Sequence, residues 1–243
     1  MALIVSAVAP VYNEEGACVQ VAQEIAQAFS EAFGADGFEI VMVDDCSADA
    51  TLARLQAAKS GIPQLRVLHH AQNAGKSRAL RTGVLAARAD IIVTLDGDGQ
   101  NPAADAARLA RKLSEALPEV GMVAGQRRNR QDTASKKWAS RTANAIRKSL
   151  LKDGSDDTGC GLKALRRQVF LRLPYFDQMH RYLPTLVAHQ GFSTLFEPVD
   201  DRPRATGQSK YTNLGRLAVA LTDLPGVLWL NSRQRSCGPV SEI

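Results

Sequence analysis

The chain turns from apolar to acidic within Ile91-Ile-Val-Thr-Leu-Asp-Gly-Asp-Gly-Gln-Asn-Pro102. The apolar residues predict a buried strand, and Pro102 suits the first turn of a helix. Between them, Asp96, Asp98 and Gln100 alternate with glycines, so an extended backbone would point their oxygens to one side. This stretch therefore predicts a strand that delivers three oxygen ligands ahead of a helix.

The same alternation of apolar runs and Ala-rich helical patterns recurs along the first half of the chain. We expect strands over 3–9, 38–44, 65–69, 90–95 and 120–125, and helices over about 16–33, 49–59, 75–88 and 102–116. This order predicts an α/β fold with a Rossmann-like, doubly wound, mainly parallel sheet and helices on both faces. Ligands of such sheets bind outside the carboxyl ends of the strands, so functional residues are expected directly after each strand.

Composition limits the size of the fold and the kinds of partner. The 243 residues suit one large domain with an extension, which we divide into a main domain over 1–212 and a C-terminal amphipathic segment over 213–243. The formal net charge of +5 fits anionic partners, but the 5% of aromatic residues do not interleave with the basic clusters, so nucleic acid is not expected. No C-x-x-C pair occurs, and no apolar stretch reaches the length of a membrane-spanning helix, so a cytoplasmic chain is expected.

Polar blocks follow the first two predicted strands. They are Pro10-Val-Tyr-Asn-Glu-Glu15 and Asp44-Asp-Cys-Ser-Ala-Asp-Ala-Thr51. Helix capping explains Ser47, Asp49 and Thr51 of the latter block as well as ligand binding does. It does not explain two adjacent carboxylates at the exit of a buried strand, which favour acceptance of hydrogen bonds from a nucleoside.

A third block, Asn73-Ala-Gly-Lys76, opens a helix whose amides and lysine could face phosphate. The spacing of a P-loop and of a dinucleotide fingerprint is missing, which disfavours an ATPase or a dehydrogenase. The oxygen donors of Asp96, Asp98 and Gln100 suit Mg²⁺ or Mn²⁺, which would keep positions for a substrate diphosphate.

Taken in order, these blocks resemble the family 2 glycosyltransferases across residues 1–125. The resemblance implies the GT-A fold, with a glycosyltransferase catalytic domain over 1–212. It also implies a metal site of Asp96, Asp98 and Gln100. The implied nucleotide-sugar site comprises Pro10, Tyr12, Asn13, Glu14, Asp44, Asp45, Lys76, Asp96 and Asp98.

The second half resembles the dolichol-phosphate mannosyltransferase group of polyprenyl-phosphate glycosyltransferases. The blocks that carry this resemblance are Gly125-Gln-Arg127, Asp157-Thr-Gly-Cys-Gly-Leu-Lys163, His180-Arg-Tyr-Leu-Pro184 and Arg202-Pro-Arg-Ala-Thr-Gly-Gln-Ser-Lys210. It implies a UDP- or GDP-linked sugar donor, a polyprenyl phosphate acceptor, and attachment at the cytoplasmic face of the membrane, directly or through a membrane-protein partner. A homo-oligomer is left open.

Basic residues of this half are expected to offset the negative charge of the donor diphosphate and the acceptor phosphate. The catalytic candidates are Asp98, Asp157, Arg127 and Arg141, and the acceptor-phosphate candidates are Arg202, Arg204, Ser209 and Lys210. A phosphate acceptor is already mostly dianionic and needs little help from a base, so a single displacement would invert C1. Asp157 is open to three roles, which are orientation of the acceptor or a basic residue, general base catalysis, and loop capping. A structural role is favoured for His180.

Two other functions are weighed against lipid-phosphate transfer. One is a glycan-extending family 2 transferase, which is disfavoured because the Q-x-x-R-W element is absent. The other is a silent nucleotide-sugar-binding subunit, which an intact Asp96-x-Asp98 disfavours. The C-terminal segment either completes the core or lies in the membrane interface, where Leu224, Val227, Leu228 and Trp229 would supply apolar anchoring.

Overall fold

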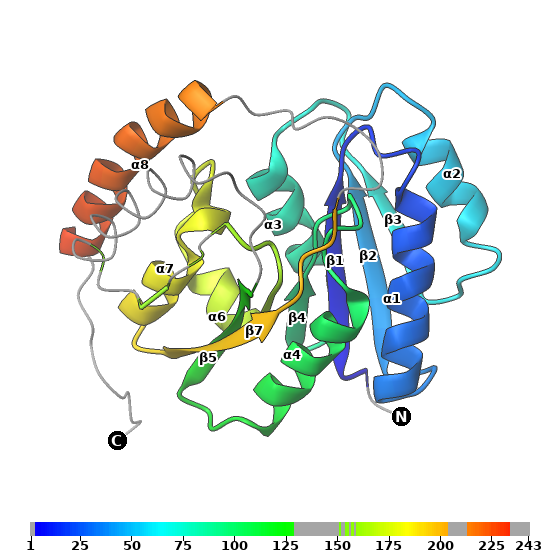
Figure 1. The fold of residues 1–243 in the computed structure, drawn as a ribbon, viewed down its shortest axis with the longest axis horizontal. Coiled ribbons are helices and arrows are strands. Elements are labelled where there is room, and N and C mark those ends of the chain that lie inside the picture. The colour runs from blue at the N-terminus through cyan, green and yellow to red at the C-terminus, as the bar shows by residue number, and fades with distance from the viewer. Residues whose placement is uncertain are drawn as a thin grey trace, which may run out of the picture.

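A central seven-stranded sheet organises the chain (Figure 1). The structure is a computed structural model, and it describes residues 3–128, 151, 154–155, 157, 159–203 and 213–233. The strand order is β3-β2-β1-β4-β6-β5-β7, and among the described strands β6 alone runs antiparallel to its neighbours. The strands are β1 (Val5–Val11), β2 (Phe38–Asp44), β3 (Leu65–His69), β4 (Ile91–Thr94), β5 (Val120–Arg127), β6 (Lys163–Arg166) and β7 (Ser193–Val199). The prediction of a mainly parallel α/β sheet is confirmed.

Helices cover both faces of the sheet because buried side chains alternate along its central strands. In β1, Ala7 and Ala9 face one hydrophobic core, whereas Val8 faces the other. The first core packs under α1 (Cys18–Phe33), α2 (Thr51–Ala58) and α4 (Ala103–Glu115). The second packs under α3 (Lys76–Ala86), α6 (Arg167–Arg172), the short helix η1 (Met179–Arg181) and α7 (Leu183–His189). This double coverage is the predicted doubly wound arrangement.

Two strands were not predicted, and the bounds of β1, β4 and β5 differ from the prediction by one or two residues. Strand β1 ends at Val11 instead of residue 9, so Pro10 and Val11 lie inside it and pair with Val43 and Asp44. Strand β6 has four residues and follows a glycine-containing segment, so it carries no clear periodic pattern. Strand β7 lies at the sheet edge, where its Pro198 is tolerated and its burial is only partial. Short length and partial exposure explain why β6 and β7 were not predicted.

The carboxyl ends of the parallel strands bring the polar blocks to one edge of the sheet. Val11, Asp44 and His69 lie side by side in the register of β1, β2 and β3. The segment after β4 continues along β1, because the Leu95 amide donates to the Val8 carbonyl at 3.1 Å. The polar residues predicted to be functional therefore lie along one edge of the sheet, at the carboxyl ends of its parallel strands.

Helix α8 (Asn213–Arg233) packs partly on the second core (Figure 1). Val227 is 1% exposed, and Leu224 and Leu228 are partly buried against this core. Of the two alternatives for this segment, completion of the core holds at Val227, because the protein itself covers this side chain. Trp229 is 59% exposed and remains on the surface. Within the part of the chain that the structure describes, no helix has the length and apolar character needed to cross a bilayer.

Candidate active site

The loops that follow β1 and β2 are bound to each other. The Asn13 amide donates to Ser47 Oγ at 2.9 Å, and the Ala48 amide donates back to Asn13 Oδ1 at 2.7 Å. Further along, the Glu14 amide donates to Thr51 Oγ1 at 2.9 Å. Asn13 adopts a φ of 52°, which its short amide tolerates better than most side chains. These polar residues thus fix the relative position of two loops, a role that neither capping nor ligand binding alone describes.

Asp45 is bound by the protein through both oxygens. Its Oδ1 accepts from His70 Nδ1 at 2.7 Å and from the Ala74 amide at 3.0 Å, and its Oδ2 accepts from the Gly75 amide at 2.8 Å. Gly75 has a φ of 85°, a backbone conformation that glycine adopts without strain. Asp45 therefore holds the loop that begins α3, and its predicted contact with the nucleotide stays a prediction.

Asp44 is fully buried, and one of its oxygens has no hydrogen-bond partner among the described residues. Its Oδ2 lies 2.8 Å from His69 Nδ1 and 3.3 Å from the Ser47 amide. No hydrogen bond reaches its Oδ1 from the described residues. A buried carboxylate oxygen without a donor is costly, which points to a ligand N–H or O–H as its partner.

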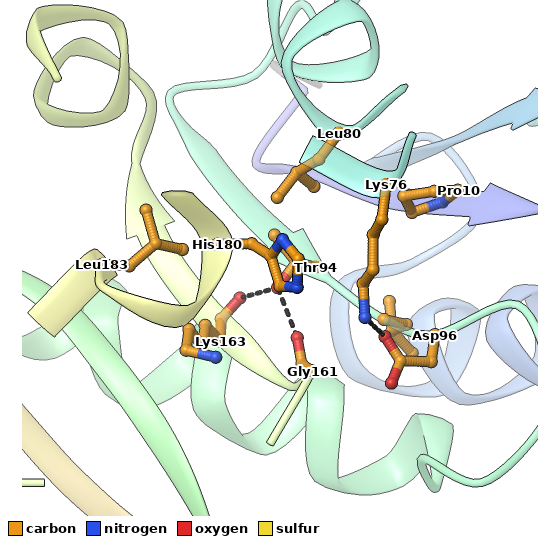
Figure 2. A pocket seen from close by; sticks show the side chains of 10 residues that line it. Pro10, Lys76, Leu80, Thr94, Asp96, Gly161, Lys163, His180 and Leu183 are labelled. Carbon is orange, nitrogen blue, oxygen red and sulfur yellow. Dashed lines mark hydrogen bonds and ion pairs between the residues drawn. The ribbon is translucent and has the colours of Figure 1, made fainter. Parts of the chain in front are cut away.

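Asp96 lies at the centre of a cluster of positive charge. Figure 2 shows the Lys76 side chain reaching from the start of α3 to this carboxylate, with which its ammonium forms an ion pair. Burial alone raises the pKa of Asp96, but the charges of Lys76, Lys163 and Arg127 outweigh it and hold the pKa below its ordinary value. Asp96 is thus an anion that three separate elements of the fold stabilise.

The residues after Asp96 form a turn, so the expected extended backbone is wrong. Gly99 has a φ of 78°, and the Gln100 amide donates to Asp98 Oδ1 at 3.1 Å. Asp98 is only 5% exposed, and Gln100 Nε2 donates to the Arg202 carbonyl at 3.3 Å. The turn forms because its side chains bond to nearby backbone groups, which competes with continuation of the strand.

Gly161 lies directly against Asp96 (Figure 2). A Cβ atom at this glycine would be 2.2 Å from Asp96 Oδ1 and 2.5 Å from its Cγ. The Thr94 hydroxyl donates to the Gly161 carbonyl at 2.6 Å and fixes this backbone next to β4. Gly161 belongs to the block from Asp157 to Lys163 but was not predicted as a site residue, because its approach to Asp96 depends on the pairing of β4 with β6.

Lys163 and His180 line a small pocket beside the Lys76–Asp96 pair (Figure 2). Lys163 is 3% exposed, and its ammonium donates to the Cys160 carbonyl. His180 Nδ1 lies 2.8 Å from Ser77 Oγ on α3. Burial, aided by the charges of Lys76, Lys163 and Arg181, holds the pKa of His180 well below its ordinary value. The imidazole is therefore neutral near pH 7. Its bond to Ser77 agrees with the structural role favoured for it.

Arg127, at the end of β5, is clamped by two carboxylates. Asp157 accepts from Arg127 Nε at 2.6 Å and from Nη2 at 2.9 Å, and Asp201 Oδ2 lies 3.4 Å from Nη1. Burial, with the charges of Asp157 and Asp98, raises the pKa of Asp201, although Arg127 opposes this effect. The bidentate pair places Asp157 where it orients a basic residue. Asp201 was not predicted, and the sequence carries no motif that marks it.

Four predicted site residues lie outside the described residues. They are Arg141, Arg204, Ser209 and Lys210. Of the predicted acceptor-phosphate residues, the described part contains Arg202, whose guanidinium pairs with Glu24 at 2.8 Å. Tyr12 and Glu14 lie in the loop that follows β1, and Pro10 lines the pocket beside Lys76.

Comparison of the sequence with known protein families identifies the class of protein to which this fold belongs. Residues 6–173 match the family model described as glycosyl transferase family 2, and the chain belongs to this family. Two relatives are undecaprenyl-phosphate 4-deoxy-4-formamido-L-arabinose transferases, one from Enterobacter sp. (strain 638) and one from Pseudomonas paraeruginosa. They are 35% and 33% identical over 90% and 91% of this chain. The chain spans 66% and 64% of their lengths.

Solved structures share the fold. A mannosyltransferase from Pyrobaculum calidifontis, in complex with GDP-Man and Mn²⁺, has a TM-score of 0.65 with 21% identity, covering 97% of this chain and 65% of its own. Glucosyl-3-phosphoglycerate synthase from Mycobacterium tuberculosis, in complex with Mn²⁺, UDP and its product, has a TM-score of 0.70 with 18% identity, covering 98% and 82%. The predicted GT-A fold and family resemblance are confirmed.

Proposed function

We propose that this chain transfers a sugar from a UDP- or GDP-linked sugar to a polyprenyl phosphate, with inversion at C1 and with the help of Mg²⁺ or Mn²⁺. The observation that carries the proposal is the cluster of positive charge around Asp96. Lys76, Lys163 and Arg127 supply that charge at the carboxyl edge of the sheet. An anionic donor and an anionic acceptor both need such charge. The names of the undecaprenyl-phosphate relatives support the lipid acceptor.

The donor would be held by the loops after β1, β2 and β4. The buried Oδ1 of Asp44 would accept from an N–H or O–H of the nucleoside, which would relieve its missing hydrogen bond. Asp45 would act indirectly, because it positions the loop that presents Lys76 to the diphosphate. Tyr12 lies in the loop beside them.

The oxygen donors Asp96, Asp98 and Gln100 fit a hard divalent cation. Within the described ranges no cluster of three His, Cys, Asp or Glu side chains gathers, so the protein would supply few ligands. This is the mode that Mg²⁺ prefers, because it keeps water and phosphate in its other positions. When bound, the metal would supply positive charge to the departing nucleoside diphosphate.

The acceptor requires orientation more than deprotonation. An oxygen of the lipid phosphate would attack C1 from the face opposite the diphosphate, and the C1–O bond would break with its electron pair leaving on the nucleoside diphosphate. The second pKa of a phosphate monoester is about 6, so the attacking group is already anionic near pH 7. The bidentate hydrogen bonds between Asp157 and Arg127 support positioning, not base catalysis, for Asp157. Arg141, Arg204, Ser209 and Lys210 remain proposed acceptor contacts.

The direct test is a product survey. The purified chain is incubated with UDP- and GDP-sugars and short polyprenyl phosphates, and the products are identified by mass spectrometry. We expect a sugar–phosphate–lipid with an inverted anomeric centre. Transfer to a sugar hydroxyl and not to the lipid phosphate would contradict the proposed acceptor.

Peripheral attachment to the cytoplasmic face of the membrane is part of the proposal, because the acceptor lipid stays in a bilayer. Basic side chains attract an anionic leaflet by about 1 kcal/mol each, and the exposed Trp229 could insert at the interface. Flotation with anionic liposomes should show binding that falls as salt rises and falls further in Trp229→Ser. Leu117→Ser is the matched control, because this exposed leucine lies beyond α4. Absence of binding at low salt would indicate a membrane-protein partner instead.

A further inference from the structure

Three cations surround Asp96, but they differ in their freedom to move. Lys163 is 3% exposed and its ammonium is bound to the Cys160 carbonyl. Arg127 is held by Asp157 at 2.6 and 2.9 Å. Two of the three positive charges are therefore fixed in place by the protein.

Of these three cations, Lys76 is the one whose side chain can move away from Asp96. Its side chain is 33% exposed, and among the described residues its ammonium pairs with Asp96. It stands at the first position of α3, directly after Gly75 with its φ of 85°. The helix start also presents backbone amides that favour an anion. Rotation of the flexible lysine side chain would carry its charge from Asp96 toward a diphosphate at this helix end without movement of the backbone.

We propose that Lys76 is an exchangeable counter-ion, which neutralises Asp96 in the free protein and transfers to the donor diphosphate when a divalent cation binds Asp96. The inference rests on the proposed function, because it assumes that the Asp96 turn receives the metal. An ammonium and a divalent cation repel each other strongly when they share one carboxylate. The diphosphate resolves the conflict, because it gives Lys76 another anionic partner.

The exchange makes metal binding and donor binding depend on each other. Metal alone must break the ion pair between Lys76 and Asp96 and add positive charge beside Lys163 and Arg127, so it binds weakly. Metal together with a nucleoside diphosphate binds more tightly. Coupling of this kind is reciprocal and typically changes affinity by about 5- to 150-fold. The exchange of Lys76 would thus keep the affinity of the site for metal low when no sugar donor is bound.

The test measures Mn²⁺ affinity directly, by electron paramagnetic resonance of free Mn²⁺, on the whole chain. Wild type, Lys76→Gln and Lys59→Gln are titrated with Mn²⁺ alone, with UDP and with GDP, and chelation by the nucleotide is measured without protein and subtracted. Lys59→Gln is the matched control, since it removes the same charge from an exposed position at the end of α2. Thermal unfolding confirms that each variant is folded.

We expect Lys76→Gln to bind Mn²⁺ alone at least 5-fold more tightly than wild type. The enhancement by nucleotide should be smaller in Lys76→Gln than in wild type and Lys59→Gln, because only direct coordination of the metal by the diphosphate remains. Equal Mn²⁺ affinity in wild type and Lys76→Gln, or a nucleotide enhancement in Lys76→Gln as large as in wild type, would overturn the inference.

The Mn²⁺ titrations and the product survey together distinguish failure of the Lys76 exchange from failure of the proposed function. If wild type forms the lipid product but Mn²⁺ and nucleotide bind independently, the exchange is wrong and the function stands. If coupling is present but the sugar passes to a hydroxyl acceptor, the exchange stands and the proposed acceptor is wrong. Absence of Mn²⁺ binding in wild type and Lys76→Gln alike would overturn both the exchange and the metal dependence.

Discussion

Substitution Gly161→Ala should disable the site without unfolding the protein. The new Cβ would lie 2.2 Å from Asp96 Oδ1, whereas ordinary contact begins at 3.4 Å, so the carboxylate must retreat by roughly 1.2 Å. The ion pair with Lys76 would be lost as Asp96 moves. A misplacement of about 1 Å typically lowers the rate about 100-fold, or about 2.7 kcal/mol in transition-state stabilisation.

The assay compares kcat/KM for lipid product with Mn²⁺ affinity and with the thermal unfolding midpoint. Gly159→Ala is a graded control in the same loop, because its Cβ would make ordinary contacts of 3.4 Å with Arg127 and 3.5 Å with Asp157. We expect Gly159→Ala to retain kcat/KM within a few-fold of wild type. Wild-type kcat/KM and wild-type Mn²⁺ affinity in a folded Gly161→Ala would refute the assignment of Asp96 to the metal.

Three further predictions concern Asp98 in the turn after β4, the ion pair between Asp157 and Arg127, and Glu39 in the sheet. Asp98→Ala should abolish transfer and leave the thermal midpoint unchanged within a few degrees; equal wild-type rates in EDTA and in Mn²⁺ would contradict this role. Asp157→Asn should raise KM for the lipid phosphate about 10-fold with the pH profile of kcat unchanged, because one charged contact to Arg127 is weakened; loss of the acidic limb of that profile would show that Asp157 is a base. Glu39→Gln should lower the free energy of unfolding by about 2–3 kcal/mol at pH 7, because buried Glu39 accepts from Ser6 at 2.7 Å and from Arg66 at 2.6 Å. Burial raises the pKa of Glu39, but these hydrogen bonds outweigh it and lower the pKa in the folded state. This carboxylate therefore stabilises the fold above its unfolded pKa, and the effect is lost as the pH falls through its folded pKa. Denaturation curves should consequently show the difference between wild type and Glu39→Gln shrinking toward acid pH.

Local sequence patterns were sufficient for the elements of the first half. The predicted helix 16–33 corresponds to α1, and the predicted strands 38–44 and 65–69 coincide with β2 and β3. These segments are long or strongly apolar, so their hydrophobic pattern indicates a helix or a strand without information from tertiary contacts. The boundary of β1 shifted by two residues because the pairing of Pro10 and Val11 with β2 is a tertiary contact.

The sequence by itself determined the class of fold and the strand ends at which the polar blocks occur. It also marked Asp96 and Asp98, since acidic residues after a buried strand have few structural explanations. Only the tertiary structure showed that Asp45 is bound by His70 and the Gly75 loop, and that Asp157 clamps Arg127. The physical reason is that hydrogen bonds and ion pairs between distant segments depend on distances of a few tenths of an ångström, which arise from sheet register and not from local composition.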